Sequence, residues 1–149
     1  MARIHAGSKL GDYFVAFRLA TRQTIKNVLE DASSNQLFGQ ALVKAGVVDR
    51  EVCEEVAGVQ RCYKRTSATL SKRGITIVLD EKVMIGDILV ALGFISPESK
   101  QECLDYQAER RARGEDAGRL GELLVDFGVC TASERDLGMK VQNWLRGVK

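Results

Sequence analysis

Hydrophobic positions recur along this chain in a fixed order that is repeated four times. Each copy begins with a bulky apolar residue and an anchor glycine, and two apolar residues follow three and four positions after that glycine. The openings are Leu10-Gly11, Phe38-Gly39, Ile85-Gly86 and Leu120-Gly121, and the later pairs are Phe14-Val15, Leu42-Val43, Leu89-Val90 and Leu124-Val125. Because residues at this spacing lie on one face of a helix, the pattern predicts a short helix with a buried face in each copy.

A turn and a second, more polar helix are predicted after each short helix. Three copies have a glycine seven positions after the anchor, where a residue free to adopt a positive φ can end a helix. These glycines are Gly46, Gly93 and Gly128, and Arg18 holds this position in the first copy. Ten positions after the anchor, every copy has a residue that favours a helix N-cap: Thr21, Asp49, Ser96 and Thr131. The sequence therefore predicts a mainly α protein of four helix–turn–helix repeats.

The spacing of the copies predicts two tandem modules. The longest interval between anchors separates the second copy from the third, so we expect a first module at residues 1–62, a spacer at residues 63–83 and a second module at residues 84–149. Residues 75–79 of the spacer are rich in β-branched side chains and predict one short strand, and we interpret the spacer as a hinge. A glutamine is predicted to end the second helix in three copies, at Gln60, Gln107 and Gln142, whereas the first copy has Ala32.

Composition narrows the class of protein. The chain has 149 residues, 45% of them apolar, which is enough to bury a core. It has neither a signal-peptide pattern nor an apolar run of membrane-spanning length, so we expect a cytoplasmic protein without direct membrane insertion. The net charge of +2 is spread over interleaved acidic and basic residues, so we expect no DNA binding.

Few residues offer enzymatic chemistry, so we expect no catalytic activity. The single histidine, His5, lies near the N-terminus, and the sequence has no phosphate-binding G-x-x-x-x-G-K-[ST] loop. We expect no cofactor, and no metal site, because one histidine cannot assemble a His-containing site. The four cysteines are far apart and form no C-x-x-C pair, so we expect reduced thiols.

The four copies resemble the MshEN motif, which occurs in the N-terminal domain of type II secretion and type IV pilus assembly ATPases. The fourth copy, from Arg119 through Gly128 to Gln142, is similar to that motif almost residue by residue, and the third copy follows it from Ile85 to Gln107. In this family two tandem motifs build one site for cyclic di-GMP. The resemblance therefore implies two such modules here, without the ATPase domain.

The resemblance also implies candidate ligand-binding residues. In the second module these are Arg119, Leu120, Gly121, Leu124, Gly128 and Gln142 in the fourth copy, and Ile85, Gly86, Leu89, Gly93 and Gln107 in the third. Weaker candidates in the first, degenerate module are Lys9, Leu10, Gly11, Phe38, Gly39, Leu42, Gly46 and Gln60.

The two modules differ at the position two residues before each anchor glycine. An arginine can donate two hydrogen bonds to guanine O6 and N7, and only the fourth copy has one, Arg119. The corresponding residues are Lys9, Leu37 and Met84, of which lysine is a point charge and the other two have no donor. The second module is therefore the stronger candidate for a nucleotide site.

Two functions are consistent with this sequence. The first is a non-enzymatic receptor module that couples cyclic di-GMP to a protein partner in a secretion, pilus or motility system. The alternative is a protein–protein adaptor of the same fold that binds no ligand.

Overall fold

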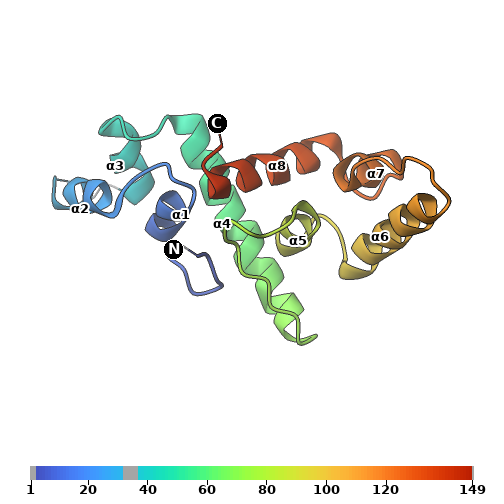
Figure 1. The fold of residues 1–149 in the computed structure, drawn as a ribbon. Helices are drawn as coiled ribbons and strands as arrows, with labels where there is room; N and C mark the ends of the chain where they lie inside the picture. The colour runs from blue at the N-terminus through green and yellow to red at the C-terminus, as the bar shows by residue number, and fades with distance from the viewer. Residues whose placement is uncertain (1–2, 32–36, 149) are drawn as a thin grey trace.

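The computed structural model describes residues 3–31 and 37–148, and within them the fold is mainly α, as predicted (Figure 1). The helices are α1 (Leu10–Ala16), α2 (Arg22–Asp31), α3 (Phe38–Lys44), α4 (Arg50–Ser71), α5 (Ile85–Ala91), α6 (Pro97–Ala112), α7 (Leu120–Asp126) and α8 (Ala132–Arg146). A helix of seven residues alternates with a longer one throughout. None of the described helices combines the length and the apolar character needed to cross a membrane.

Side-chain caps fix the residues at which the longer helices begin. Each predicted N-cap side chain accepts a hydrogen bond from the backbone amide three positions later. The pairs are Thr21 with Thr24, Asp49 with Val52, Ser96 with Ser99 and Thr131 with Glu134, at 2.8 to 3.1 Å. The carboxylate of Glu134 also accepts from the amide of Thr131, which completes a capping box. Because these bonds satisfy amides that lack a partner within the helix, the helix starts are encoded locally.

The turns between short and long helices use the left-handed backbone conformation. Gly46, Gly93 and Gly128 have φ values of 75°, 81° and 71°. Arg18 adopts the same conformation with a φ of 60°, although a side chain there costs about 1 to 2 kcal/mol. Its guanidinium donates to the carbonyl of Leu145 at 3.4 Å and to Glu81 at 3.3 Å. These contacts with distant parts of the chain offset some of the backbone cost.

The helices pack in the same way in the first half (α1–α4) and in the second half (α5–α8). In the first half α1 packs against α4 and α2 against α3, and in the second half α5 packs against α8 and α6 against α7. Figure 1 shows α2 and α3 at one end of an elongated molecule and α6 and α7 at the other.

The junction between the two halves is a packed interface. One buried cluster contains Phe17 and Val59 from the first half together with Leu92 and Leu145 from the second. The rings of Phe17 and Trp144 lie 5.1 Å apart, and an ion pair of 2.8 Å joins Lys140 to Glu55. The spacer therefore does not leave the halves free to move as the predicted hinge would.

The spacer differs from the prediction in its secondary structure. Helix α4 continues to Ser71, and the predicted strand at residues 75–79 is wrong: only Leu79 forms a bridge, with Ile4. A strand needs a partner backbone along its length, and Ile4 supplies one for a single residue. The helices also continue beyond the glutamines that were predicted to end them, to Ser71, Ala112 and Arg146.

The contact between α5 and α8 depends on Gly138. A Cβ added there would lie 2.6 Å from Cδ2 of Leu89, which is fully buried and has no room to move. We expect Gly138→Ala to lower the free energy of unfolding by about 1 to 3 kcal/mol, because overpacking outweighs the better helix propensity of alanine. Urea denaturation measures this difference.

Gly11→Ala is the matched control for Gly138→Ala. A Cβ on Gly11 would meet Ile25 and Phe38 at an ordinary 3.7 Å, so alanine is expected to be neutral or stabilising by up to about 1 kcal/mol. Equal destabilisation by both substitutions would contradict this account of α5–α8 packing.

Candidate functional site

The residue two positions before each anchor glycine is the N-cap of a short helix. These residues are Lys9, Leu37, Met84 and Arg119, and all have an extended backbone. Their side chains are exposed, with 69% of Leu37 and 62% of Met84 accessible to solvent. Within residues 3–31 and 37–148, nothing forms an ion pair with the guanidinium of Arg119. Arg119 is therefore free to bind an external group.

The anchor glycines allow each short helix to approach the long helix that follows it. A Cβ on any of them would meet the side chain fourteen positions later. The pairs are Gly11 with Ile25 at 3.7 Å, Gly39 with Cys53 at 3.0 Å, Gly86 with Lys100 at 3.1 Å and Gly121 with Arg135 at 3.4 Å. This packing explains the anchor glycines without a ligand.

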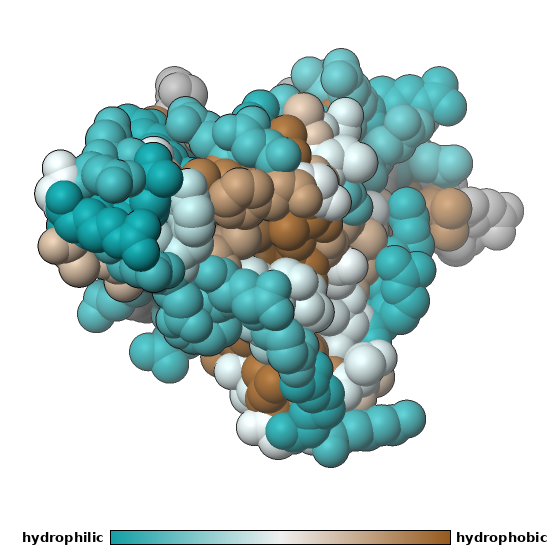
Figure 2. Space-filling model, turned by 90° about the vertical axis from the view of Figure 1, so that its right-hand side faces the viewer, coloured by the Kyte–Doolittle hydropathy of each residue, from teal (hydrophilic) through white to brown (hydrophobic). Residues whose placement is uncertain are grey.

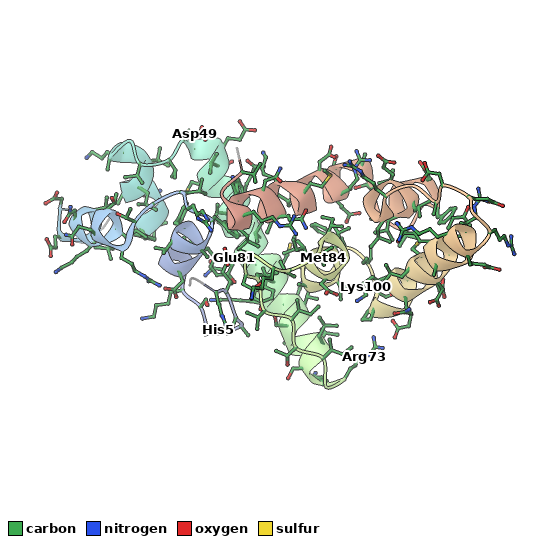
Figure 3. All side chains as sticks on the ribbon, viewed as in Figure 1. His5, Asp49, Arg73, Glu81, Met84 and Lys100 are labelled. Atoms are coloured by element: carbon green, nitrogen blue, oxygen red, sulfur yellow. The ribbon has the colours of Figure 1, made fainter. Side chains whose placement is uncertain are left out.

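The side chains that cover the anchor glycines differ between the halves. Ile25 and Cys53 are uncharged, whereas Lys100 and Arg135 in the second half are basic. Lys100 reaches from α6 toward α5, where its Nζ lies 2.7 Å from Asp87 (Figure 3). Arg135 pairs with Asp136 at 2.9 Å. In both, the aliphatic stem covers the glycine and the charged group lies at the surface.

The N-terminal turns of α5 and α7 touch each other. A Cβ on Gly86 would lie 2.9 Å from Cδ2 of Leu120, the first residue of α7. The N-caps Met84 and Arg119 therefore belong to two helix starts in direct contact. Free amide groups and the helix dipole make each start favourable for negative charge, although the helices are short. The structure brings Arg119, Lys100 and Arg135 to these two turns.

Two predicted ligand-binding glutamines, Gln107 and Gln142, donate hydrogen bonds to backbone carbonyls. Nε2 of Gln107, which is 5% exposed, donates to the carbonyl of Gly118 at 2.9 Å. Nε2 of Gln142 donates to the carbonyl of Val83 at 3.4 Å. Gly118 and Val83 immediately precede the N-caps Arg119 and Met84. Each glutamine of the second half thus holds the loop before the other copy's short helix.

Most other predicted ligand residues take part in the packing or in the turns of the fold. Leu42, Leu89 and Leu124 are fully buried. Leu10, Phe38, Ile85 and Leu120 are half-buried and pack against the core. Gly46, Gly93 and Gly128 adopt the positive φ of their turns. Ala32 lies outside the described residues.

The first half has an apolar hollow beside Gly39. The hollow has a volume of about 770 Å³, and its lining includes Leu37, Phe38, Cys53 and Ala57. In the second half, the larger Arg135 and Met139 occupy the positions of Cys53 and Ala57. The hollow therefore follows from two small side chains on α4.

Three of the four cysteine thiols have a raised pKa. Burial raises the pKa of the thiols of Cys53, Cys103 and Cys130, so these cysteines are protonated and poorly nucleophilic at neutral pH. Among the described residues, no three His, Cys, Asp or Glu side chains gather closely enough to hold a metal ion.

No family model, curated protein or solved structure matches this chain.

Sequence reasoning missed Lys100 and Arg135. Both lie fourteen positions after an anchor glycine, and this repeated spacing is the sequence feature that could have identified them. The signal gained meaning only when the structure showed that this position covers the glycine.

The buried bond of Gln107 predicts a structural role that can be measured. Gln107→Leu removes the donor to Gly118, so we expect the free energy of unfolding to fall by about 1 to 2 kcal/mol. Gln60→Leu is the control at the corresponding position of the first half, where no described group bonds the amide, and we expect a change below about 0.5 kcal/mol. Chemical denaturation of both variants checks this. If Gln107→Leu is as stable as the wild-type protein, the structural role is contradicted and ligand binding becomes the better account of this glutamine.

Proposed function

We propose that this chain is a non-enzymatic receptor module for a cyclic dinucleotide, bound by the second half. The resemblance to MshEN motifs gives cyclic di-GMP as the ligand. This molecule presents two guanines and two phosphates in a ring, so a receptor needs a donor for guanine and positive charge for phosphate. We further propose that binding is coupled to a secretion, pilus or motility partner.

The observation that carries the proposal is the group of three basic side chains at the touching starts of α5 and α7. Arg119 has the donor geometry that guanine requires. Lys100 and Arg135 are held in partly exposed ion pairs with Asp87 and Asp136. Such surface pairs contribute little stability, so a phosphate can compete for the basic groups.

The backbone around these residues also suits a ligand with two equivalent halves. The reciprocal bonds of Gln107 and Gln142 hold the loops before the two short helices in place. A binding site that is already ordered costs less conformational entropy when the ligand arrives. In this proposal the glutamines, buried leucines and glycines position the site, and Arg119, Lys100 and Arg135 contact the ligand.

Calorimetric titration with cyclic di-GMP tests the proposal. We expect saturable binding and a ligand-dependent rise in melting temperature. Arg119→Ala is expected to weaken binding about tenfold or more, because a bidentate arginine–guanine contact is worth about 1 to 3 kcal/mol. Arg119 is exposed and has no ion-pair partner among the residues that the structure describes, so the variant is expected to melt like the wild-type protein without ligand.

Arg61→Ala is the charge-matched control, since Arg61 is an exposed arginine on α4 in the first half. It is expected to leave the affinity unchanged. Absence of heat and of thermal stabilisation at millimolar ligand would refute the receptor proposal, and equal weakening by both variants would refute the role of Arg119.

The hollow beside Gly39 favours a second candidate function, a protein–protein adaptor. The hollow is lined largely by apolar side chains and is open to solvent, and Leu37 projects at its edge. Apolar residues also reach the surface at the α6–α7 end, where Figure 2 shows a hydrophobic area within a hydrophilic surround. Exposed apolar areas of this kind often mark contacts with another protein.

Filling the hollow separates the adaptor from the receptor. Ala57→Met is expected to fill it with the residue type that the second half carries at Met139, and to leave the melting temperature unchanged or higher. Under the adaptor function, this variant loses binding to purified secretion, pilus or motility components in a pull-down. Binding that survives Ala57→Met would exclude the hollow as the docking site.

A further inference from the structure

The second half of α4 has a positive charge that the rest of the chain does not share. Residues 56–79 contain five basic side chains and no acidic one, which gives this segment a charge of +5. The other 125 residues contain 17 basic and 20 acidic side chains, so their net charge is −3. The two signs are therefore interleaved along most of the sequence but not here.

Four of the basic side chains lie on one face of α4 and its C-cap, and we call them the basic stripe. Its members are Arg61, Lys64, Arg65 and Lys72, and all are exposed. The last three follow the first at three, four and eleven residues, a spacing that keeps them on one side of a helix. The other side of α4 is buried through Val59, Tyr63 and Leu70. Figure 1 shows this end of α4 extending beyond the other helices.

Among the residues that the structure describes, no carboxylate forms an ion pair with the basic stripe. The adjacent Arg73 shows the contrast, since it pairs with Glu98 of α6. Positive charge at a helix C-terminus is favourable because of the helix dipole, which accounts for Lys72. The three earlier members lie more than a turn before the end of α4, where this effect fades. Arg61 and Arg65 are like charges four residues apart, which weakens a helix, so the stability of α4 does not explain the basic stripe.

The length of the basic stripe limits the size of the partner. From Arg61 to Lys72 the stripe extends about 16 Å, at 1.5 Å per residue of helix. Glu54, which is exposed on the same face two turns earlier, marks its N-terminal boundary. A nucleic-acid duplex or a membrane is longer than the stripe, so either would also bring negative charge against Glu54. A short acidic segment of a protein fits within the stripe.

The side chains near the basic stripe also favour a protein partner. Among the described residues, no large hydrophobic side chain of residues 56–79 is strongly exposed, whereas a helix that binds a membrane surface inserts such side chains among the lipids. The single aromatic residue of this segment, Tyr63, is buried and offers no ring for stacking on a nucleobase. The guanidinium groups of Arg61 and Arg65 have the fork geometry that binds both oxygens of a carboxylate.

We propose that the basic stripe of α4 binds an acidic segment of a protein partner, in which several Asp or Glu side chains follow closely along the chain. Charge-assisted hydrogen bonds from arginine and lysine to carboxylates hold the two chains together. The basic stripe lies in the first half, whereas the nucleotide proposal concerns Arg119 in the second half. The inference therefore goes beyond the proposed receptor function and does not depend on it.

Titration of the full chain, labelled with 15N, with hexaglutamate in the absence of nucleotide tests the inference. Hexaglutamate is about 20 Å long when extended, which matches the length of the basic stripe. We expect saturable binding, with NMR shift changes centred on the amides of residues 61–72. Raising the salt concentration from about 50 to about 150 mM is expected to weaken binding about tenfold, because salt screens exposed charges.

Two double variants separate the basic stripe from the general charge of the protein. Lys64→Gln combined with Arg65→Gln removes two members of the stripe, and it is expected to weaken hexaglutamate binding about tenfold. Lys26→Gln combined with Arg111→Gln removes the same charge from exposed positions of α2 and α6, and it is expected to change the affinity less than about twofold. Because all four positions are exposed and glutamine is a good helix former, both proteins are expected to melt like the wild type.

Four results would overturn the inference. These are no saturation at millimolar hexaglutamate, shift changes centred outside residues 61–72, equal weakening by the two double variants, and tighter binding of duplex DNA or of phosphatidylserine vesicles through the same residues. The last result would assign the basic stripe to a nucleic acid or to a membrane. The shift changes are measured on the wild-type protein, so they decide the matter even if a variant fails to fold. Failure here leaves the nucleotide proposal intact, because Arg119 is tested with a different ligand.

Discussion

The close approach of each short helix to the following long helix is the constraint on which this fold depends. At all four anchor glycines, a Cβ would meet the side chain fourteen positions later, at 3.0 to 3.7 Å. The short helices have only seven residues and would not be stable alone, because helix nucleation is costly. Their stability comes from packing an apolar face, and the glycine sets how near that face can come.

The same kind of contact also joins the two halves. Thr66 on α4 lies against the turn glycine Gly93, and the side chain of Arg18 in the first turn lies against Gly147 at the end of α8. Each half thus places a turn against the terminal part of the other half's last helix. The left-handed conformation of Arg18 is understandable in this setting, because glycine there would lose the side chain that reaches Leu145 and Glu81. Arg18 thus adopts a backbone conformation that favours glycine, and its long-range contacts offset the cost.

Local signals predicted more of this structure than long-range ones. The N-caps Thr21, Asp49, Ser96 and Thr131 were correct because a cap and its amide lie within one turn of helix. The strand at residues 75–79 was wrong because its existence depends on a partner far along the chain, and Ile4 pairs with one residue only. The backbone hydrogen bonds of Gln107 and Gln142 could not be predicted from the sequence either, because each carbonyl partner becomes a neighbour only when the helices pack.

The chemistry that each half presents is decided by the long helices. The glycine that defines the repeat is common to all four copies, so it cannot distinguish a nucleotide site from an apolar one. The residue fourteen positions later, which covers the glycine, can distinguish the two. On α4 the small Cys53 leaves a hollow, whereas on α8 Arg135 covers Gly121 with its stem and places a guanidinium at the surface. One backbone constraint thus produces an apolar depression in the first half and a basic rim in the second. Differences in function between repeats of this kind are therefore better sought fourteen positions after the glycine than at the glycine itself.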